Sequence, residues 1–219
     1  MRASIACLVT LLVTLLAAPA AHAGEIALFN GKDLSGWTFF LERQGPNAGG
    51  GMKMEDVWTV TDGVLRCAGV PNGYIRTTAD YTSYRLRLEW RWPGTPTNSG
   101  VLLRLVGPDK VWPRSIEAQL MDGNAGDIWL VDGAKLAGDP AHADPKFANH
   151  FVRPRSAEKP PGQWNEYDIT LDGGRVALKV NGVLLNGGSG AEVIAGKIGL
   201  QSEGSPIEFR NIRLTPLDR

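Results

Sequence analysis

The sequence predicts an all-β protein in which two antiparallel sheets pack as a jelly-roll sandwich. Short runs of alternating apolar and polar residues, separated by Gly, Pro, Asn and Asp, recur from residue 24 onward. After that point no window of about 12 residues has the 3.6-residue apolar period of a helix, so a helix-covered parallel sheet is disfavoured. About a dozen strands are expected, which suits a jelly roll.

The composition indicates one globular domain. The chain has 219 residues, of which 43% are hydrophobic and 21% are charged, and this balance can build a core but is too polar for a membrane protein. The 23 Lys and Arg residues balance the 23 Asp and Glu residues, and no long basic run occurs. A nucleic-acid partner is therefore not expected.

The first residues have the pattern of a secretory signal. An apolar run over 5–18 is followed by the triplet Ala21-His22-Ala23, which fits a signal-peptidase site. The run is shorter than the roughly 20 residues that a membrane-spanning helix needs. The sequence predicts a signal peptide over 1–23, cleavage near Ala23, export to the periplasm or beyond, and one domain over 24–219 with no transmembrane segment.

The strands are predicted from local alternation and turn residues. From Tyr84 to Trp92 every second residue is aromatic or Leu, while the residues between them are charged. Asp62-Gly63 and Asn181-Gly182 are typical of tight hairpin turns, so each is expected to join two strands. The further strand candidates are Gly100–Val106, Ser115–Met121, Ile128–Val131, Glu166–Leu171, Lys197–Gln201 and Ile207–Leu214.

Two long irregular segments, 43–55 and 133–163, are expected to be functional or mobile loops. The second contains His142 and His150, and we expect it to close over a sugar. These two histidines lie eight positions apart with no further His or Cys nearby, so no metal site is predicted from them.

The candidate catalytic residues lie on the strand that begins at Ser115. Alternation places Glu117 and Gln119 on one face, about 6.6 Å apart along the strand. Such a pair could bind hydroxyl groups and move a proton, or it could simply be a solvated face. Asp122 precedes Gly123, so it is a candidate either for a turn or for catalysis.

A second group of candidates lies on neighbouring strands. Arg104 interrupts an apolar strand, and a buried guanidinium requires a carboxylate partner or an anionic ligand. Glu117 is a candidate partner, and an internal ion pair without any ligand is the alternative. Gln201 and Glu203 share strand parity and could face the same surface as Glu117.

The tryptophans divide into two groups. Trp112 and Trp129 lie beside loops and are candidates for stacking on sugar rings. Alternation assigns four of the remaining five to the core, namely Trp37, Trp58, Trp90 and Trp92. Walker, Rossmann, Gly-x-Ser-x-Gly and calcium-loop motifs are absent from the sequence, which disfavours phosphoryl transfer and triad hydrolysis.

Several segments together resemble the bacterial 3-keto-disaccharide hydrolase domain family. The matching segments run in order through the chain: Leu28–Trp37, Trp58–Leu65, Asn98–Val101, Glu117–Asp122, Pro161–Asn165, Ile198–Gln201 and Ile207–Ile212. The resemblance implies a concanavalin A-like jelly roll, export, and cleavage of glycosides oxidised to a ketone at carbon 3. It leaves hydrolases, lyases and sugar binders open.

One departure from the family pattern concerns a candidate residue. Where the family often has Gln-x-His-Gly, this chain has Gln201-Ser202-Glu203-Gly204. If that histidine acts in catalysis or metal binding elsewhere, Glu203 must replace it or the activity differs.

The resemblance implies a mechanism through an enolate, formed by removing the proton on carbon 2. We expect Glu117 as the base, Arg104 as the group that stabilises the enolate, and Glu203 or Asp122 as the acid. The expected substrate-binding residues are Gln119, Gln201, Asn98, Trp112, Trp129 and His150. No cofactor is predicted, although a divalent cation bound by these carboxylates is an alternative way to polarise the ketone.

Two other functions compete with this one. The same fold serves non-catalytic carbohydrate-binding modules, because fold does not fix function. A retaining glucanase would need paired carboxylates, and Gln119 stands where the second carboxylate would be expected.

Overall fold

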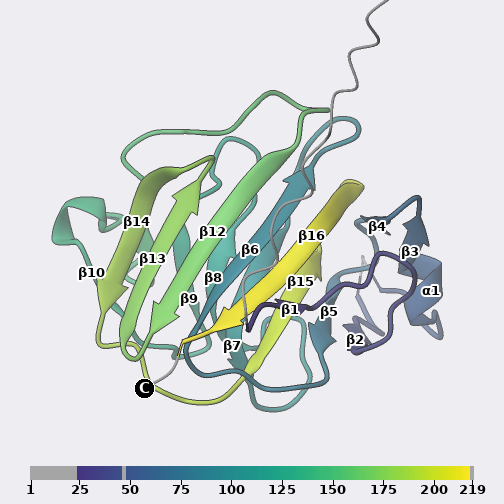
Figure 1. Cartoon of the computed structure of the whole chain (residues 1–219), viewed down its shortest axis with the longest axis horizontal. Coiled ribbons are helices and arrows are strands. Elements are labelled where there is room, and N and C mark those ends of the chain that lie inside the picture. Colours follow the sequence, from purple (N-terminus) through teal and green to yellow (C-terminus); the bar gives the residue numbers. More distant parts are fainter. Residues whose placement is uncertain (1–23, 46–47, 218–219) are drawn as a thin grey trace, which may run out of the picture.

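The computed structural model describes residues 24–45 and 48–217, and these form a sandwich of two antiparallel sheets (Figure 1). One sheet has nine strands and the other has seven. The expected all-β, two-sheet architecture is confirmed. The predicted signal peptide lies outside the described residues.

The nine-stranded sheet is the front layer in Figure 1. Strand β1 (Ile26–Ala27) pairs with β16 at its side. The other strands follow the order β10 (Ala137–Gly138), β14 (Val183–Ser189), β13 (Arg175–Val180), β12 (Asn165–Asp172), β6 (Tyr84–Arg91), β16 (Ile207–Pro216), β4 (Val64–Cys67) and β3 (Trp58–Thr61).

The seven-stranded sheet lies behind it. Its order is β11 (His150–Phe151), β9 (Ile128–Val131), β8 (Arg114–Gln119), β7 (Gly100–Val106), β15 (Lys197–Ser202), β5 (Gly73–Thr77) and β2 (Trp37–Leu41). The helical elements of the described chain are short: α1 (Met54–Val57) and the 3₁₀ turn η1 (Pro140–His142). None of these is a helix that could span a membrane.

Both predicted hairpins are present. Asp62 and Gly63 have φ angles of 52° and 75° between β3 and β4. Asn181 and Gly182 have φ angles of 50° and 79° between β13 and β14. These positive angles are the ones that Asn, Asp and Gly adopt most readily, which is why the sequence signal was reliable here.

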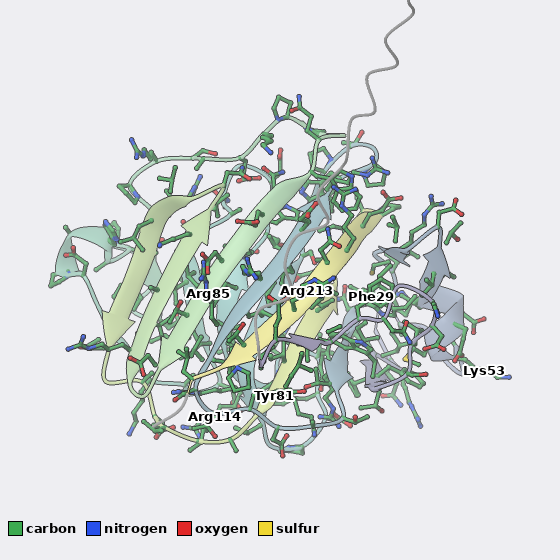
Figure 2. All side chains as sticks on the ribbon, in the orientation of Figure 1. Phe29, Lys53, Tyr81, Arg85, Arg114 and Arg213 are labelled. Carbon is green, nitrogen blue, oxygen red and sulfur yellow. The ribbon has the colours of Figure 1, made fainter. Side chains whose placement is uncertain are left out.

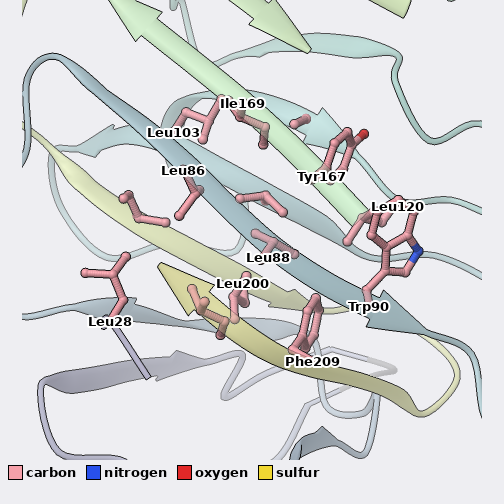
Figure 3. Packing of buried hydrophobic residues seen from close by; sticks show 14 of the residues in the cluster. Leu28, Leu86, Leu88, Trp90, Leu103, Leu120, Tyr167, Ile169, Leu200 and Phe209 are labelled. Carbon is pink, nitrogen blue, oxygen red and sulfur yellow. The ribbon is translucent and has the colours of Figure 1, made fainter. Parts of the chain in front are cut away.

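The core lies between the two sheets. Leu86, Leu88 and Trp90 of β6 point inward and are 1% exposed or less, as alternation predicted (Figure 3). They meet Leu103 of β7 and Leu200 of β15 from the other sheet. The four tryptophans assigned to the core are all 5% exposed or less, namely Trp37, Trp58, Trp90 and Trp92.

The outer face of the nine-stranded sheet carries paired charges. Figure 2 shows Arg85 and Arg213 on this layer. Arg85 Nη2 lies 2.6 Å from Asp168 Oδ2, and Arg91 Nε lies 2.6 Å from Glu208 Oε2. The charged side chains that alternate with the core residues of β6 therefore stabilise the sheet by pairing with the neighbouring strands.

The segment 133–163 was expected to close over a sugar, and parts of it pair with both sheets. It supplies β10 to the nine-stranded sheet and β11 to the seven-stranded sheet. Its His142 lies beside Asn186 of β14, with Nδ1 3.2 Å from Oδ1. His150 instead pairs in register with Trp129 on the outer face of the seven-stranded sheet.

Candidate active site

A groove of about 400 Å³ lies on the outer face of the seven-stranded sheet. Seven of the sequence-predicted residues line it, namely Asn98, Trp112, Glu117, Gln119, Trp129, His150 and Glu203. The others that line it are Met121, Asn124, Asp127, Val131, Asp132 and Asn149. The structure thus brings together most of the predicted site.

The groove runs along β8, and its two ends differ in polarity. Val131 of β9 pairs with Ser115 near the start of β8, and Trp129 pairs with Glu117 in the middle of β8. Val131 therefore lies toward the start of β8, on the side of Trp112. Gly100 pairs with Gln119 at the opposite end. The end of the groove at the start of β8 is called the aromatic end, and its residues are Trp112, Val131 and Asp132. The end at Gln119 is called the polar end, and its residues are Asn98, Gln119, Asn124, Asp127 and Glu203. Glu117 lies between the two ends.

Glu117 is a buried acid with an elevated pKa. Its side chain comes from the middle of β8, and the residue is 6% exposed. Desolvation raises its pKa to about 8, the negative charge of Glu203 adds to the rise, and the amide of Gln201 partly offsets it. A group of this kind can hold or release a proton near neutral pH.

Gly100 makes room for this carboxyl group. A Cβ atom at position 100 would lie 2.4 Å from Glu117 Oε1 and 2.4 Å from Gln201 Oε1. Gln201 is 1% exposed and does not line the groove, and its side-chain amide acts on the Glu117 carboxyl group. The structure thus places Gln201 beside Glu117 and not at the groove surface.

Glu203 is the second acid of the groove. It pairs with Asn98 through an isolated β-bridge at the end of β15. Desolvation raises its pKa to about 7, and a hydrogen bond with Asn98 opposes the rise. Glu203 is less buried than Glu117, so the groove holds two carboxyl groups whose pKa values both lie near neutrality.

Gln119 has a fixed amide orientation. Its Oε1 accepts hydrogen bonds of 2.8 Å from both Leu120 N and Met121 N. Because the acceptor side of the amide is occupied, the Nε2 group is the side available to a ligand in the groove.

His150 forms part of the groove wall. Its ring stacks on Trp129 with centroids 3.9 Å apart and an angle of 7° between the planes. His150 Nδ1 lies 2.7 Å from Asp144 Oδ2, and Nε2 lies 3.1 Å from Asp127 Oδ2. Asp127 also accepts from Arg153. Since both ring nitrogens face carboxylates, His150 holds Trp129 and Asp127 in place.

Arg104 is not part of the groove, contrary to the sequence expectation. Its guanidinium donates to three backbone carbonyl oxygens, those of Thr82, Gly173 and Glu192, at 2.5–3.1 Å. The register of β7 and β8 shifts between Leu103 and Val106, and Arg104 has a φ of 49°. This β-bulge breaks the alternation on which the expectation rested, and the side chain joins the seven-stranded sheet to the turns of the other sheet.

Asp122 is also outside the groove. It is exposed, and its backbone N–H donates to Thr97 O at 2.9 Å in the turn that follows β8. Of the two readings that the sequence allowed, the structure favours the turn.

Sequence reasoning missed several residues that line the groove. Asp127 precedes the predicted strand 128–131 by one residue, and it shares strand parity with Trp129 and Val131. Extending the alternation by one position would have found it. Asn124 and Asn149 lie outside the strands, where alternation carries no signal.

Within 24–45 and 48–217 no group of three His, Cys, Asp or Glu side chains is arranged so that it could hold a metal ion.

Solved structures with the same architecture include a presumed glycosyl hydrolase from Parabacteroides distasonis. It has 26% sequence identity, covers 90% of this chain and 95% of its own, and gives a TM-score of 0.65. The β-glucanase of Bacillus licheniformis is 11% identical, with coverages of 89% and 99% and a TM-score of 0.53. The carbohydrate-binding module CBM66 of Bacillus subtilis is 11% identical, with coverages of 81% and 94% and a TM-score of 0.52.

The last two similarities show the fold alone, which is the concanavalin A-like sandwich. No curated protein matches the sequence. The family model of the 3-keto-alpha-glucoside-1,2-lyase-like domain matches residues 24–215. With its two-sheet sandwich and its polar groove, the chain belongs to this carbohydrate-active family.

Proposed function

We propose that this protein cleaves 3-keto-glucosides by elimination across carbons 1 and 2, with subsequent hydration as an optional second step. The observation that carries the proposal is the pair of acids Glu117 and Glu203, which share one groove and have pKa values raised to about 8 and about 7. General acid and base groups work best when their pKa values lie near the working pH.

The chemistry follows from the ketone. A carbonyl at carbon 3 acidifies the hydrogen on carbon 2, so a base can remove it and leave an enolate. The electron pair then forms the bond between carbons 1 and 2 while the bond from carbon 1 to the glycosidic oxygen breaks. An acid protonates that oxygen, and the products are an enone and a free alcohol. Addition of water to the enone gives the 3-keto sugar and makes the net reaction a hydrolysis.

We assign Glu203 as the base and Glu117 as the acid, the reverse of the roles expected from the sequence. Glu117 is the more buried of the two, so desolvation favours its protonated form more strongly. The positions of the two acids in the groove support the same assignment of base and acid. Glu203 lies at the polar end, where the oxidised sugar finds amide partners, and Glu117 lies midway along the groove, where the glycosidic oxygen would be.

Gln119 takes the role of stabilising the enolate, which was first expected of Arg104. Its Oε1 is held by two backbone N–H groups, so its Nε2 can donate to the ketone oxygen as negative charge develops there. Asn98 holds Glu203 and completes the polar end. Export remains part of the proposal, and it rests on the signal pattern of residues 1–23.

The test compares products from a 3-keto-α-glucoside and from the same glucoside without the ketone, with and without chelator. We expect release of the alcohol from the ketone only, together with loss of deuterium from a substrate labelled at carbon 2. A glucanase would cleave both compounds. A non-catalytic module would bind with saturable affinity and release no product, and either result would overturn the proposal.

A further inference from the structure

The aromatic end of the groove is unexplained by the proposed chemistry, which needs only Glu117 and the polar end. Trp112 at this end is 45% exposed, and Phe147, which does not itself line the groove, is 51% exposed. Phe147 lies against Trp129, with ring centroids 5.5 Å apart. Exposed apolar side chains grouped at a groove are typical of a ligand site.

Asp132 is the one polar residue among the three assigned to the aromatic end. Its Oδ2 accepts a 2.5 Å hydrogen bond from Lys110 Nζ. At the polar end, by contrast, Gln119 keeps its Nε2 group available, and Asn98, Asn124, Asp127 and Glu203 also line the groove. A second sugar at the aromatic end would therefore find fewer polar side chains for its hydroxyls than the oxidised sugar finds at the polar end.

The loop that carries Trp112 is fixed on two sides. Asp109 accepts a 2.9 Å hydrogen bond from Tyr74 and forms an ion pair of 2.6 Å with Arg76, both on β5. One residue later, Lys110 reaches Asp132 beyond the end of β9. The loop is thus held to strands on opposite sides of β7 and β8, which limits the movement of the segment that carries Trp112.

We propose that the aromatic end is a subsite for the leaving group and that it selects an aromatic aglycone over a second sugar. This inference rests on the proposed function, because the oxidised sugar is placed at the polar end and the glycosidic oxygen at Glu117. The aglycone then extends along β8 onto Trp112, where a flat apolar ring can stack.

The experiment measures kcat/KM for wild type, Trp112→Ala and Met121→Ala on three substrates: phenyl 3-keto-α-glucoside, methyl 3-keto-α-glucoside and a 3-keto-disaccharide. Each variant is compared with wild type on the same substrate, so differences in leaving-group ability cancel. Met121 is the matched control, since it is also 45% exposed and lines the groove but follows β8 at the polar end.

We expect Trp112→Ala to lower kcat/KM about tenfold on the phenyl substrate, which corresponds to about 1.4 kcal/mol, and less than about twofold on the methyl substrate. Met121→Ala should change both substrates to the same extent. Equal losses on the phenyl and methyl substrates in Trp112→Ala would overturn the inference. A loss on the disaccharide as large as that on the phenyl compound would do the same, because it would indicate a second-sugar subsite.

A binding measurement separates this inference from the proposed function. Affinities of phenyl and methyl α-glucoside are measured for Glu117→Gln with and without Trp112→Ala. If wild type cleaves no 3-keto-glucoside, the proposed function fails, whereas a loss of affinity confined to the phenyl compound still supports an aromatic subsite. Equal affinities with and without Trp112 would overturn the subsite.

Discussion

Two buried carboxyl groups on the outer faces of the two sheets, Glu208 and Glu117, differ in whether a cation pairs with them. On the nine-stranded sheet Glu208 is 5% exposed and pairs with both Arg66 and Arg91. On the seven-stranded sheet Glu117 is 6% exposed, and no cation among the described residues pairs with it. The two side chains are almost equally buried, so the difference between them is whether a cation pairs with the carboxyl group.

The comparison teaches how to separate stabilising charges from reactive ones. A buried carboxylate beside a guanidinium stays ionised and contributes to folding, and Asp168, whose pKa is lowered by its hydrogen bond to Arg85, is an example. A buried carboxyl group without a cation keeps its proton to higher pH and costs stability, and such groups cluster at functional sites. Glu117 and Glu203 are of the second kind.

The largest effect should come from removing the unpaired acid. Glu117→Gln keeps the shape of the side chain but cannot give up a proton, so kcat should fall by between about 100-fold and 10,000-fold. Glu208→Gln is the matched control on the other sheet. It should lower the free energy of unfolding by about 1 kcal/mol or more and leave kcat unchanged.

Steady-state kinetics with a 3-keto-glucoside and urea unfolding provide the two readouts. Wild-type kcat in Glu117→Gln would remove Glu117 from the mechanism. A large loss of kcat in Glu208→Gln would show that pairing with a cation does not separate the structural acid from the catalytic one.

The second effect concerns Arg104, a buried cation that serves structure. Arg104→Met leaves the carbonyl oxygens of Thr82, Gly173 and Glu192 without this donor, so the free energy of unfolding should fall by about 2 kcal/mol. The exposed Arg155 is the control, and Arg155→Met should change stability by less than about 0.5 kcal/mol. A folded Arg104→Met protein with greatly reduced kcat and unchanged stability would contradict this assignment.

The third effect is a bell-shaped dependence of kcat/KM on pH. Activity should rise as Glu203 loses its proton near pH 7 and fall as Glu117 loses its proton near pH 8, because the base must be ionised and the acid protonated. Since the two groups interact, the measured values belong to the pair. Glu117→Gln should abolish the basic limb of the residual activity, and persistence of that limb would contradict the assignment.

The smallest effect should come from filling the space beside Glu117 with a methyl group. The methyl group of Gly100→Ala would displace Glu117 and Gln201 side-chain atoms, so kcat should fall about tenfold while the fold persists. Gly94→Ala is the control, since a Cβ atom there meets nothing within 4 Å. Equal kcat values for the two variants would mean that the position of Glu117 is not critical.

The parts of this protein that are encoded locally could be predicted from the sequence. Alternation predicted β6 and its buried face, and Asp-Gly and Asn-Gly predicted two hairpins, because side-chain direction and turn geometry depend on adjacent residues. The same alternation placed Glu117 and Gln119 on one face, and both line the groove. Strands β2 and β5 were missed, because aromatic and glycine-containing runs gave no clear period.

Only the tertiary structure decided what the candidate residues do. The bulge in β7 turned Arg104 away from the groove and toward carbonyl groups contributed by three distant turns. The elevated pKa values of Glu117 and Glu203 come from burial and from strands far apart in the sequence. Strand parity is a property of neighbouring residues, whereas desolvation and pairing depend on what the rest of the chain places around each group.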